Sequence, residues 1–152
     1  MKIIVLVIIV AMIFLSLGLW LTAYGNITSD ERNMNYGISM STDKMIYFVG
    51  EPIKMTLKIF NYTEGEITFH FNTGQRYDFI IEDEKGNEIW RWSKDRMFVM
   101  VLGEETLGPT NPEIIFTVEY KDKPSPGFYK VTGILVPEDR PMSGNVIIII
   151  AK

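Results

Sequence analysis

Side chains able to act as an acid, a base or a nucleophile are sparse in this sequence. His70 is the only histidine, and it falls on the polar side of an alternating stretch, where a solvated imidazole is expected rather than a catalytic base. No serine stands in a Gly-x-Ser-x-Gly pattern, and no His-Glu-x-x-His is present. These residue types predict a protein that is not an enzyme.

The sequence also offers no pattern for a metal, a cofactor or a nucleic acid. There is no cysteine, and the carboxylates Glu82, Asp83 and Glu84 do not follow a calcium loop, so a solvated turn is expected there. No glycine-rich loop opens a helix to bind phosphate. The net charge is −4, without the basic stripe that nucleic-acid binding needs.

The richest stretch is the aromatic segment 69–93, which predicts a β-hairpin. Tyr77, Phe79 and Ile81 alternate as in a strand, and Ile89–Trp92 returns as a second strand. Between them lies a three-residue loop that ends at Gly86, where a left-handed backbone conformation is expected. Such a loop pairs Asp83 with Asn87 and Ile81 with Ile89.

That pairing predicts an exposed aromatic patch for binding a protein. Trp90 and Trp92 would lie on the face away from Phe79, and tryptophan is enriched at binding hot spots. Two alternatives remain: a loop such as 103–112 covers the patch, or a shift of one residue places both tryptophans beside Phe79 in one core. At the preceding link, Gln75 and Arg76 are either rim contacts or part of a solvated turn. The candidate partner-binding residues are Gln75, Arg76, Asp78, Ile80, Trp90 and Trp92.

The rest of the chain from Tyr36 onward follows a β pattern. Ile53–Asn61 alternates apolar and polar side chains, whereas Met97–Leu102 is apolar at every position. The 103–112 segment is predicted to be the longest loop, and Tyr129 after Pro-Gly fits a tyrosine corner. About eight strands at roughly ten-residue spacing predict an all-β, immunoglobulin-like antiparallel β-sandwich, with a flattened barrel as the alternative.

Residues 3–24 form an apolar run without any charge. As a helix, the run would span roughly 30 Å, which predicts a transmembrane helix or signal anchor. A cleaved signal peptide and a buried globular helix are the alternatives. Because Lys2 precedes the run, the positive-inside rule places the later residues outside the cytoplasm, or in the secreted protein if the leader is cleaved. The predicted division is 1–24 anchor or signal, 25–35 tether, and 36–152 β-domain.

The central stretch resembles the BsuPI family, which are intracellular proteinase inhibitors of subtilisin-like serine proteases. The resemblance covers roughly residues 38–150, although segment 107–113 departs from the shorter turn that the family pattern implies. The residues that carry it are Phe69, Phe71, Gly74, Gln75, Tyr77, Asp78, Phe79, Gly86, Trp90, Arg91, Trp92 and Ser93, with Phe98 and Pro126–Tyr129 farther on.

Two functional hypotheses follow. The first is a non-enzymatic, membrane-tethered domain that binds a protein, which the resemblance implies to be a subtilisin-like serine protease. The second is an extracytoplasmic structural or adhesion-like sandwich that binds a cell-envelope component. The family description places its members inside cells, whereas the leader predicts a location outside the cytoplasm. Fold alone does not decide between these hypotheses, because β-sandwiches host many functions.

Overall fold

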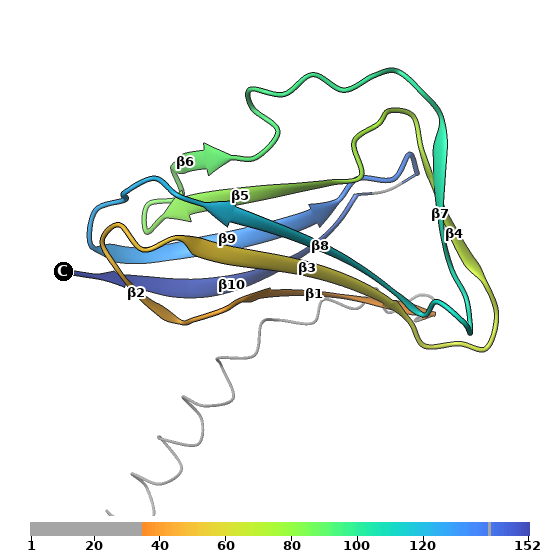
Figure 1. Cartoon of the computed structure of the whole chain (residues 1–152), viewed down its shortest axis with the longest axis horizontal. Helices are drawn as coiled ribbons and strands as arrows, with labels where there is room; N and C mark the ends of the chain where they lie inside the picture. Colours follow the sequence, from red (N-terminus) through yellow and green to blue (C-terminus); the bar gives the residue numbers. More distant parts are fainter. Residues whose placement is uncertain (1–34, 140) are drawn as a thin grey trace, which may run out of the picture.

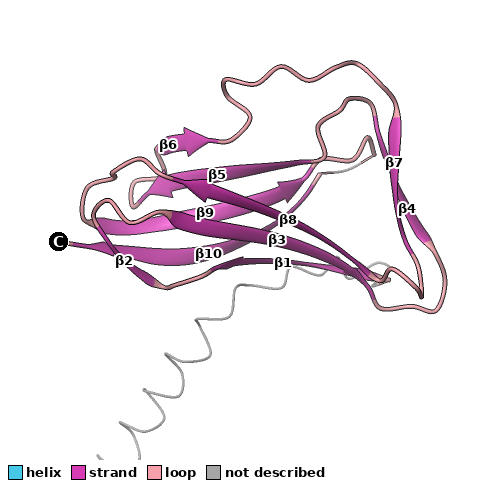
Figure 2. Cartoon of the chain, viewed as in Figure 1, coloured by secondary structure: helices cyan, strands magenta, loops and turns pink. Residues whose placement is uncertain are grey.

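The computed structural model describes residues 35–139 and 141–152, and these residues form strands and loops without a helix (Figure 2). No helix in the described ranges is long and apolar enough to cross a membrane. The predicted anchor at 3–24 and, apart from Asn35, the predicted tether lie outside the described residues, so the domain division stays a prediction. The strands are β1 (Tyr36–Thr42), β2 (Ile46–Phe48), β3 (Ile53–Asn61), β4 (Ile67–Phe71), β5 (Tyr77–Asp83), β6 (Glu88–Arg91), β7 (Gly103–Leu107), β8 (Glu113–Tyr120), β9 (Gly127–Leu135) and β10 (Met142–Ala151).

The strands form two larger sheets and one short ladder. The five-stranded sheet has the order β2-β10-β9-β5-β6, and the three-stranded sheet has the order β1-β3-β8. The β4–β7 ladder stands across one end of these sheets (Figure 1). The prediction of an all-β domain is confirmed for the described residues, and the arrangement is consistent with a β-sandwich.

Alternating side chains from the two larger sheets fill the core. Ile53, Met55, Leu57 and Ile59 of β3 are almost fully buried, as the alternation of that segment predicted. The opposite sheet contributes inward residues from β5, β9 and β10 to the same cluster. Strand periodicity therefore decides which face of each strand is removed from water. The core residues from those three strands include Phe79, Ile81, Val131, Leu135, Val146, Ile148 and Ile150.

Two segments differ from the expected β pattern. The predicted 103–112 loop begins with β7, which pairs with β4 from Phe71–Gly103 to Ile67–Leu107. The preceding apolar run 97–102 is not a strand but an exposed loop. β7 was missed because its sequence Gly-Glu-Glu-Thr-Leu has little apolar alternation, while backbone hydrogen bonds suffice to pair it with a neighbour.

β2 is a short edge strand that joins the five-stranded sheet in parallel with β10, an exception to the predicted antiparallel arrangement. Met45 and Val49 exchange backbone hydrogen bonds with β10, so the intervening Phe48 turns its backbone toward the free edge. At that edge, Glu51 forms hydrogen bonds with both backbone groups of Phe48. Its carboxylate accepts the Phe48 N–H at 3.0 Å, and its own N–H donates to the Phe48 carbonyl at 3.0 Å. The Phe48 hydrogen bond, helped by Lys44, lowers the pKa of the Glu51 carboxyl.

The central hairpin has the predicted turn but not the predicted register. Gly86 has φ of 80°, and the Asp83 N–H donates to the Asn87 carbonyl at 3.0 Å. The pairing then shifts between Ile81 and Glu82, because Ile89 is an extra residue in β6. Trp90 therefore lies opposite Ile81, and the predicted pairing of Ile81 with Ile89 is wrong.

The shift reverses the face assigned to the tryptophans. Trp92 N–H donates to the Phe79 carbonyl at 2.9 Å, which places the Trp92 side chain on the same face as Phe79. Trp90 and Trp92 are partly buried and pack against the core. The alternative register, with both tryptophans beside Phe79, is the one observed. The predicted tyrosine corner is confirmed, since the Tyr129 hydroxyl donates to the Ser125 carbonyl at 2.7 Å.

The hairpin turn gives a test of backbone strain alone. A Cβ added at Gly86 would meet no atom within 4 Å, so Gly86→Ala adds no clash but forces alanine into the left-handed region. We expect a loss of about 1 kcal/mol in the free energy of unfolding, measured with urea, and a smaller loss for Gly86→Asn. The neighbouring exposed control, Lys85→Ala, should change stability by less than about 0.5 kcal/mol. Equal losses of unfolding free energy for all three variants would contradict the left-handed conformation assigned to Gly86.

The Asp78 network and a candidate protein-binding loop

Asp78 is a buried carboxylate at the junction of β5, β6 and the following loop. Its neighbours Tyr77 and Phe79 face the core, so Asp78 points to the other side of the sheet, yet it is only 4% exposed. Ser93 donates to it from the backbone N–H at 3.0 Å and from Oγ at 2.6 Å, and the Phe79 N–H donates at 2.9 Å. The Arg91 guanidinium adds a fourth donor at 3.1 Å. We call Asp78, Arg91 and Ser93 the Asp78 network.

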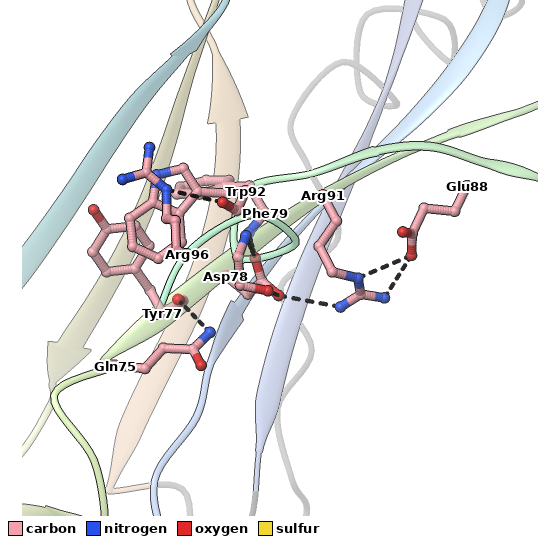
Figure 3. Close-up of polar contacts among 9 residues, drawn as sticks. Gln75, Tyr77, Asp78, Phe79, Glu88, Arg91, Trp92 and Arg96 are labelled. Atoms are coloured by element: carbon pink, nitrogen blue, oxygen red, sulfur yellow. Dashed lines mark hydrogen bonds and ion pairs between the residues drawn. The ribbon is translucent and has the colours of Figure 1, made fainter. Parts of the chain in front are cut away.

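Arg91 connects the Asp78 network to an exposed carboxylate. Figure 3 shows its guanidinium reaching Asp78 on one side and Glu88 on the other, with Nη2 2.7 Å from Glu88 Oε2. The hydrogen bond with Arg91 lowers the pKa of Glu88, and the same bond raises the pKa of Arg91. Arg91 is thereby held charged next to the buried Asp78, which is the arrangement that a buried carboxylate requires.

Beyond the network, Trp92 is the centre of an aromatic cluster. Its ring centroid lies 4.5 Å from that of Tyr77 and 5.7 Å from that of Phe98. The Arg96 guanidinium lies 4.3 Å from the centre of the Trp92 ring, and its Nε donates to the Trp92 carbonyl (Figure 3). Burial raises the pKa of the Tyr77 hydroxyl. The chain that leaves β6 is therefore fixed by cation–π, stacking and hydrogen-bond contacts.

The segment that follows, Met97–Leu102, is an exposed apolar loop, which we call the apolar loop. The exposed fractions are 101% for Met97, 84% for Met100 and 80% for Leu102. Phe98 turns inward onto Trp92, and the Val99 carbonyl accepts the Gly74 N–H at 2.9 Å. The loop then enters β7 at Gly103. Apolar side chains are thus held in water by contacts made at both ends of the loop.

The link between β4 and β5 supports the apolar loop from below. A Cβ at Gly74 would come within 3.2 Å of Val99 Cγ2, so the absence of a side chain permits the close approach. Arg76 donates to Glu105 at 3.1 Å and to the Thr73 carbonyl at 2.7 Å, and its guanidinium lies 4.6 Å from the centre of the Phe71 ring. Arg76 therefore ties the link to β7 and β4.

The six predicted binding residues do not form one exposed face. Asp78 is buried, and Trp90 packs on Tyr120 with ring centroids 5.2 Å apart. Ile80 is half-buried opposite Arg91, and the Gln75 amide donates to the Tyr77 carbonyl. Of the six, Trp92 contacts the apolar loop through Phe98, and Arg76 lies against Gly103 where the loop enters β7. That these six residues contact a partner stays a prediction.

The apolar loop itself was not among the predicted site residues, although its sequence carries a signal. It has no polar–apolar alternation, and it lies between the charged residues 94–96 and Gly103. A shallow cavity of about 250 Å³ adjoins its end and is lined by His70, Phe71, Leu102, Gly103, Glu104 and Glu138. His70 is exposed, as predicted, and pairs with Glu104 at 3.1 Å.

The Asp78 network can be tested by removing its charge. Asp78→Asn replaces the oxygen that accepts from Arg91 Nη1 and Ser93 Oγ by an NH2 group, which cannot accept a hydrogen bond. We expect a loss of about 3 kcal/mol in the free energy of unfolding. Ser93→Ala removes only the hydroxyl bond and should cost about 1 kcal/mol. The control Asp95→Asn, which is exposed in the loop after β6, should leave the urea unfolding curve unchanged; a curve for Asp78→Asn that matches this control would refute the role of the network.

Solved structures share the fold at low sequence identity. The sporulation control protein Spo0M from Bacillus subtilis is 14% identical, with a TM-score of 0.51 over 79% of this chain. The chain covers 51% of that structure, so it spans about half of its length. The C-terminal domain of wzt is 8% identical, with a TM-score of 0.50 over 86% of this chain and 81% of its own. Likeness at these identities shows the fold alone, and no curated protein matches the sequence.

A family model gives the more specific match. It covers residues 40–140 and describes an intracellular proteinase inhibitor. This description contradicts the predicted location outside the cytoplasm, which relied on one lysine and an apolar run. The matched region contains the Asp78 network, the aromatic cluster around Trp92 and the apolar loop. Asp78, Arg91, Trp92 and Ser93 are among the residues that carry the family resemblance, and the apolar loop follows them in the chain. The chain belongs to the BsuPI family of intracellular proteinase inhibitors.

Proposed function

We propose that the β-domain inhibits a subtilisin-like serine protease by binding it, without catalysis of its own, through the apolar loop. Membership in a family of proteinase inhibitors supports a protease as the partner. The sequence resemblance supports the subtilisin-like class. The alternative of an adhesion-like protein is not retained, because it required the location outside the cytoplasm.

The exposed apolar loop is the observation that carries this proposal. Contiguous apolar side chains on a soluble domain mark interaction sites, and methionine is enriched at interfaces and adapts to irregular surfaces. Met97, Met100 and Leu102 each expose four fifths or more of their surface. Moving them from water into a partner's cleft contributes favourable free energy through the hydrophobic effect.

The support beneath the loop favours tight binding as well. A segment that is already fixed before binding loses less conformational entropy on association than a flexible one. Phe98 on Trp92 and the Val99–Gly74 hydrogen bond provide this fixation. We therefore assign Asp78, Trp92 and Arg76 a supporting role, in which they position the loop rather than contact the protease.

The proposal predicts that the loop side chains are needed for inhibition but not for folding. In a triple variant, Met97, Met100 and Leu102 are replaced by threonine. Inhibition of subtilisin by the full-length protein, followed with a chromogenic peptide substrate, should weaken by at least about thirtyfold, since an interface anchor contributes about 2 kcal/mol or more. The urea unfolding curve should stay the same, because all three side chains are exposed.

A matched control replaces an equal number of exposed apolar side chains on a different surface. Ile46, Phe48 and Ile147 are 54%, 58% and 52% exposed on β2 and β10, and they too are changed to threonine. This variant should inhibit like the original protein. If it loses inhibition while the loop variant retains it, the binding surface lies on that sheet. If the unaltered protein does not slow subtilisin at all, the proposed partner class is wrong.

A further inference from the structure

The apolar loop has a defined apex. Within it, the Val101 N–H donates to the Val99 carbonyl at 3.0 Å, a three-residue turn with Met100 at its centre. Met100 is 84% exposed, and Val99 and Val101 on either side are 70% and 50% exposed. The exposure of Met100 shows that its side chain, at the centre of the turn, faces solvent rather than the β-domain.

The main chain at this apex is available to a partner. In the described part of the chain, the backbone N–H groups of Met100 and Leu102 have no hydrogen-bond partner. A second protein can form hydrogen bonds with free backbone N–H groups of this kind when the segment pairs with one of its strands. In that mode, the main chain supplies affinity and pockets for the side chains supply specificity.

Both flanks of the apex are fixed to the β-domain. On the N-terminal side, Val99 is bound to Gly74. On the C-terminal side, Gly103 pairs with Phe71 at the start of β7, against the guanidinium of Arg76. The peptide bond after Met100 is therefore held between two anchors, one at Gly74 in the β4–β5 link and the other at Phe71 in β4.

From this geometry we infer that Met100 is the residue that enters the primary specificity pocket of the protease, and that this pocket is apolar. The inference rests on the proposed function and names the residue that determines which protease is bound. Met97 is a weaker candidate because it directly follows the Arg96 anchor on Trp92. Leu102 is weaker because it adjoins the acidic cavity that contains Glu104 and Glu138.

The two anchors also explain how a segment bound in the manner of a substrate would inhibit. A substrate leaves the protease after its peptide bond is cut because its two halves separate. Here, water added across the bond between Met100 and Val101 would yield a new carboxyl end and a new amino end that both remain attached to the β-domain. The cut product stays in place, so it continues to occupy the cleft and the reverse reaction remains accessible.

The experiment compares two exposed methionines in the same loop. The inhibition constant of the protein against subtilisin is measured for Met100→Asp and Met100→Leu, and for comparison within the loop for Met97→Asp and Met97→Leu. A carboxylate forced into an apolar pocket should raise the constant by about 100-fold or more at Met100, and by less than about tenfold at Met97. Leucine at either position should stay within about threefold, because the side-chain volume is kept.

Equal effects at the two positions, or no effect of Met100→Asp, would overturn the inference while leaving the proposed function intact. Failure of the unaltered protein to inhibit subtilisin would instead overturn the proposed function. Mass spectrometry after long incubation gives an independent readout: any slow cut within the loop should follow Met100. A main cut at a different bond of the loop would contradict the assignment of Met100 to the primary pocket.

Discussion

The burial of the Asp78 carboxylate is the constraint on which the candidate site depends. Removing a carboxylate from water costs several kcal/mol unless donors replace the lost hydration. Here, four donors converge on it, three of them from residues 91 and 93 at the end of the hairpin. The end of β6 can therefore take only one position relative to β5. That position sets the place of Trp92, and Trp92 in turn fixes Arg96 and Phe98 at the root of the apolar loop.

Features that depend on local sequence could be predicted. The alternation of Ile53–Asn61 identified the buried face of β3, and Gly86 identified the left-handed turn residue. The register beyond that turn could not be predicted. Ile89-Trp90-Arg91-Trp92 alternates in either register, and a single extra residue at Ile89 moves both tryptophans to the other face. The observed register is favoured because it removes the large aromatic rings from water. That gain depends on the core that both sheets form, so the sequence of the hairpin alone does not reveal it.

The candidate site was displaced from its predicted position for a related reason. Aromatic side chains suggest binding because they are frequent at interfaces, yet the same side chains are also the largest core residues. Here, Trp90 and Trp92 pack against the core, and the exposed surface of the apolar loop comes from aliphatic and methionine side chains. An apolar run such as 97–102 looks like core by composition. Only the tertiary structure reveals that β7 and the β4–β5 link carry it on the outside of the sheets.

The blocked edge at β2 has a consequence for the protein at high concentration. A sheet edge grows into a fibril when an incoming chain finds free backbone donors and acceptors beside apolar side chains. Phe48 supplies the exposed aromatic ring, but Glu51 already occupies both of its backbone groups. An incoming strand must displace a carboxylate before it can pair. Because the pKa of that carboxyl is lowered, the barrier to fibril growth persists in mildly acidic surroundings where an ordinary glutamate would already begin to be neutralised.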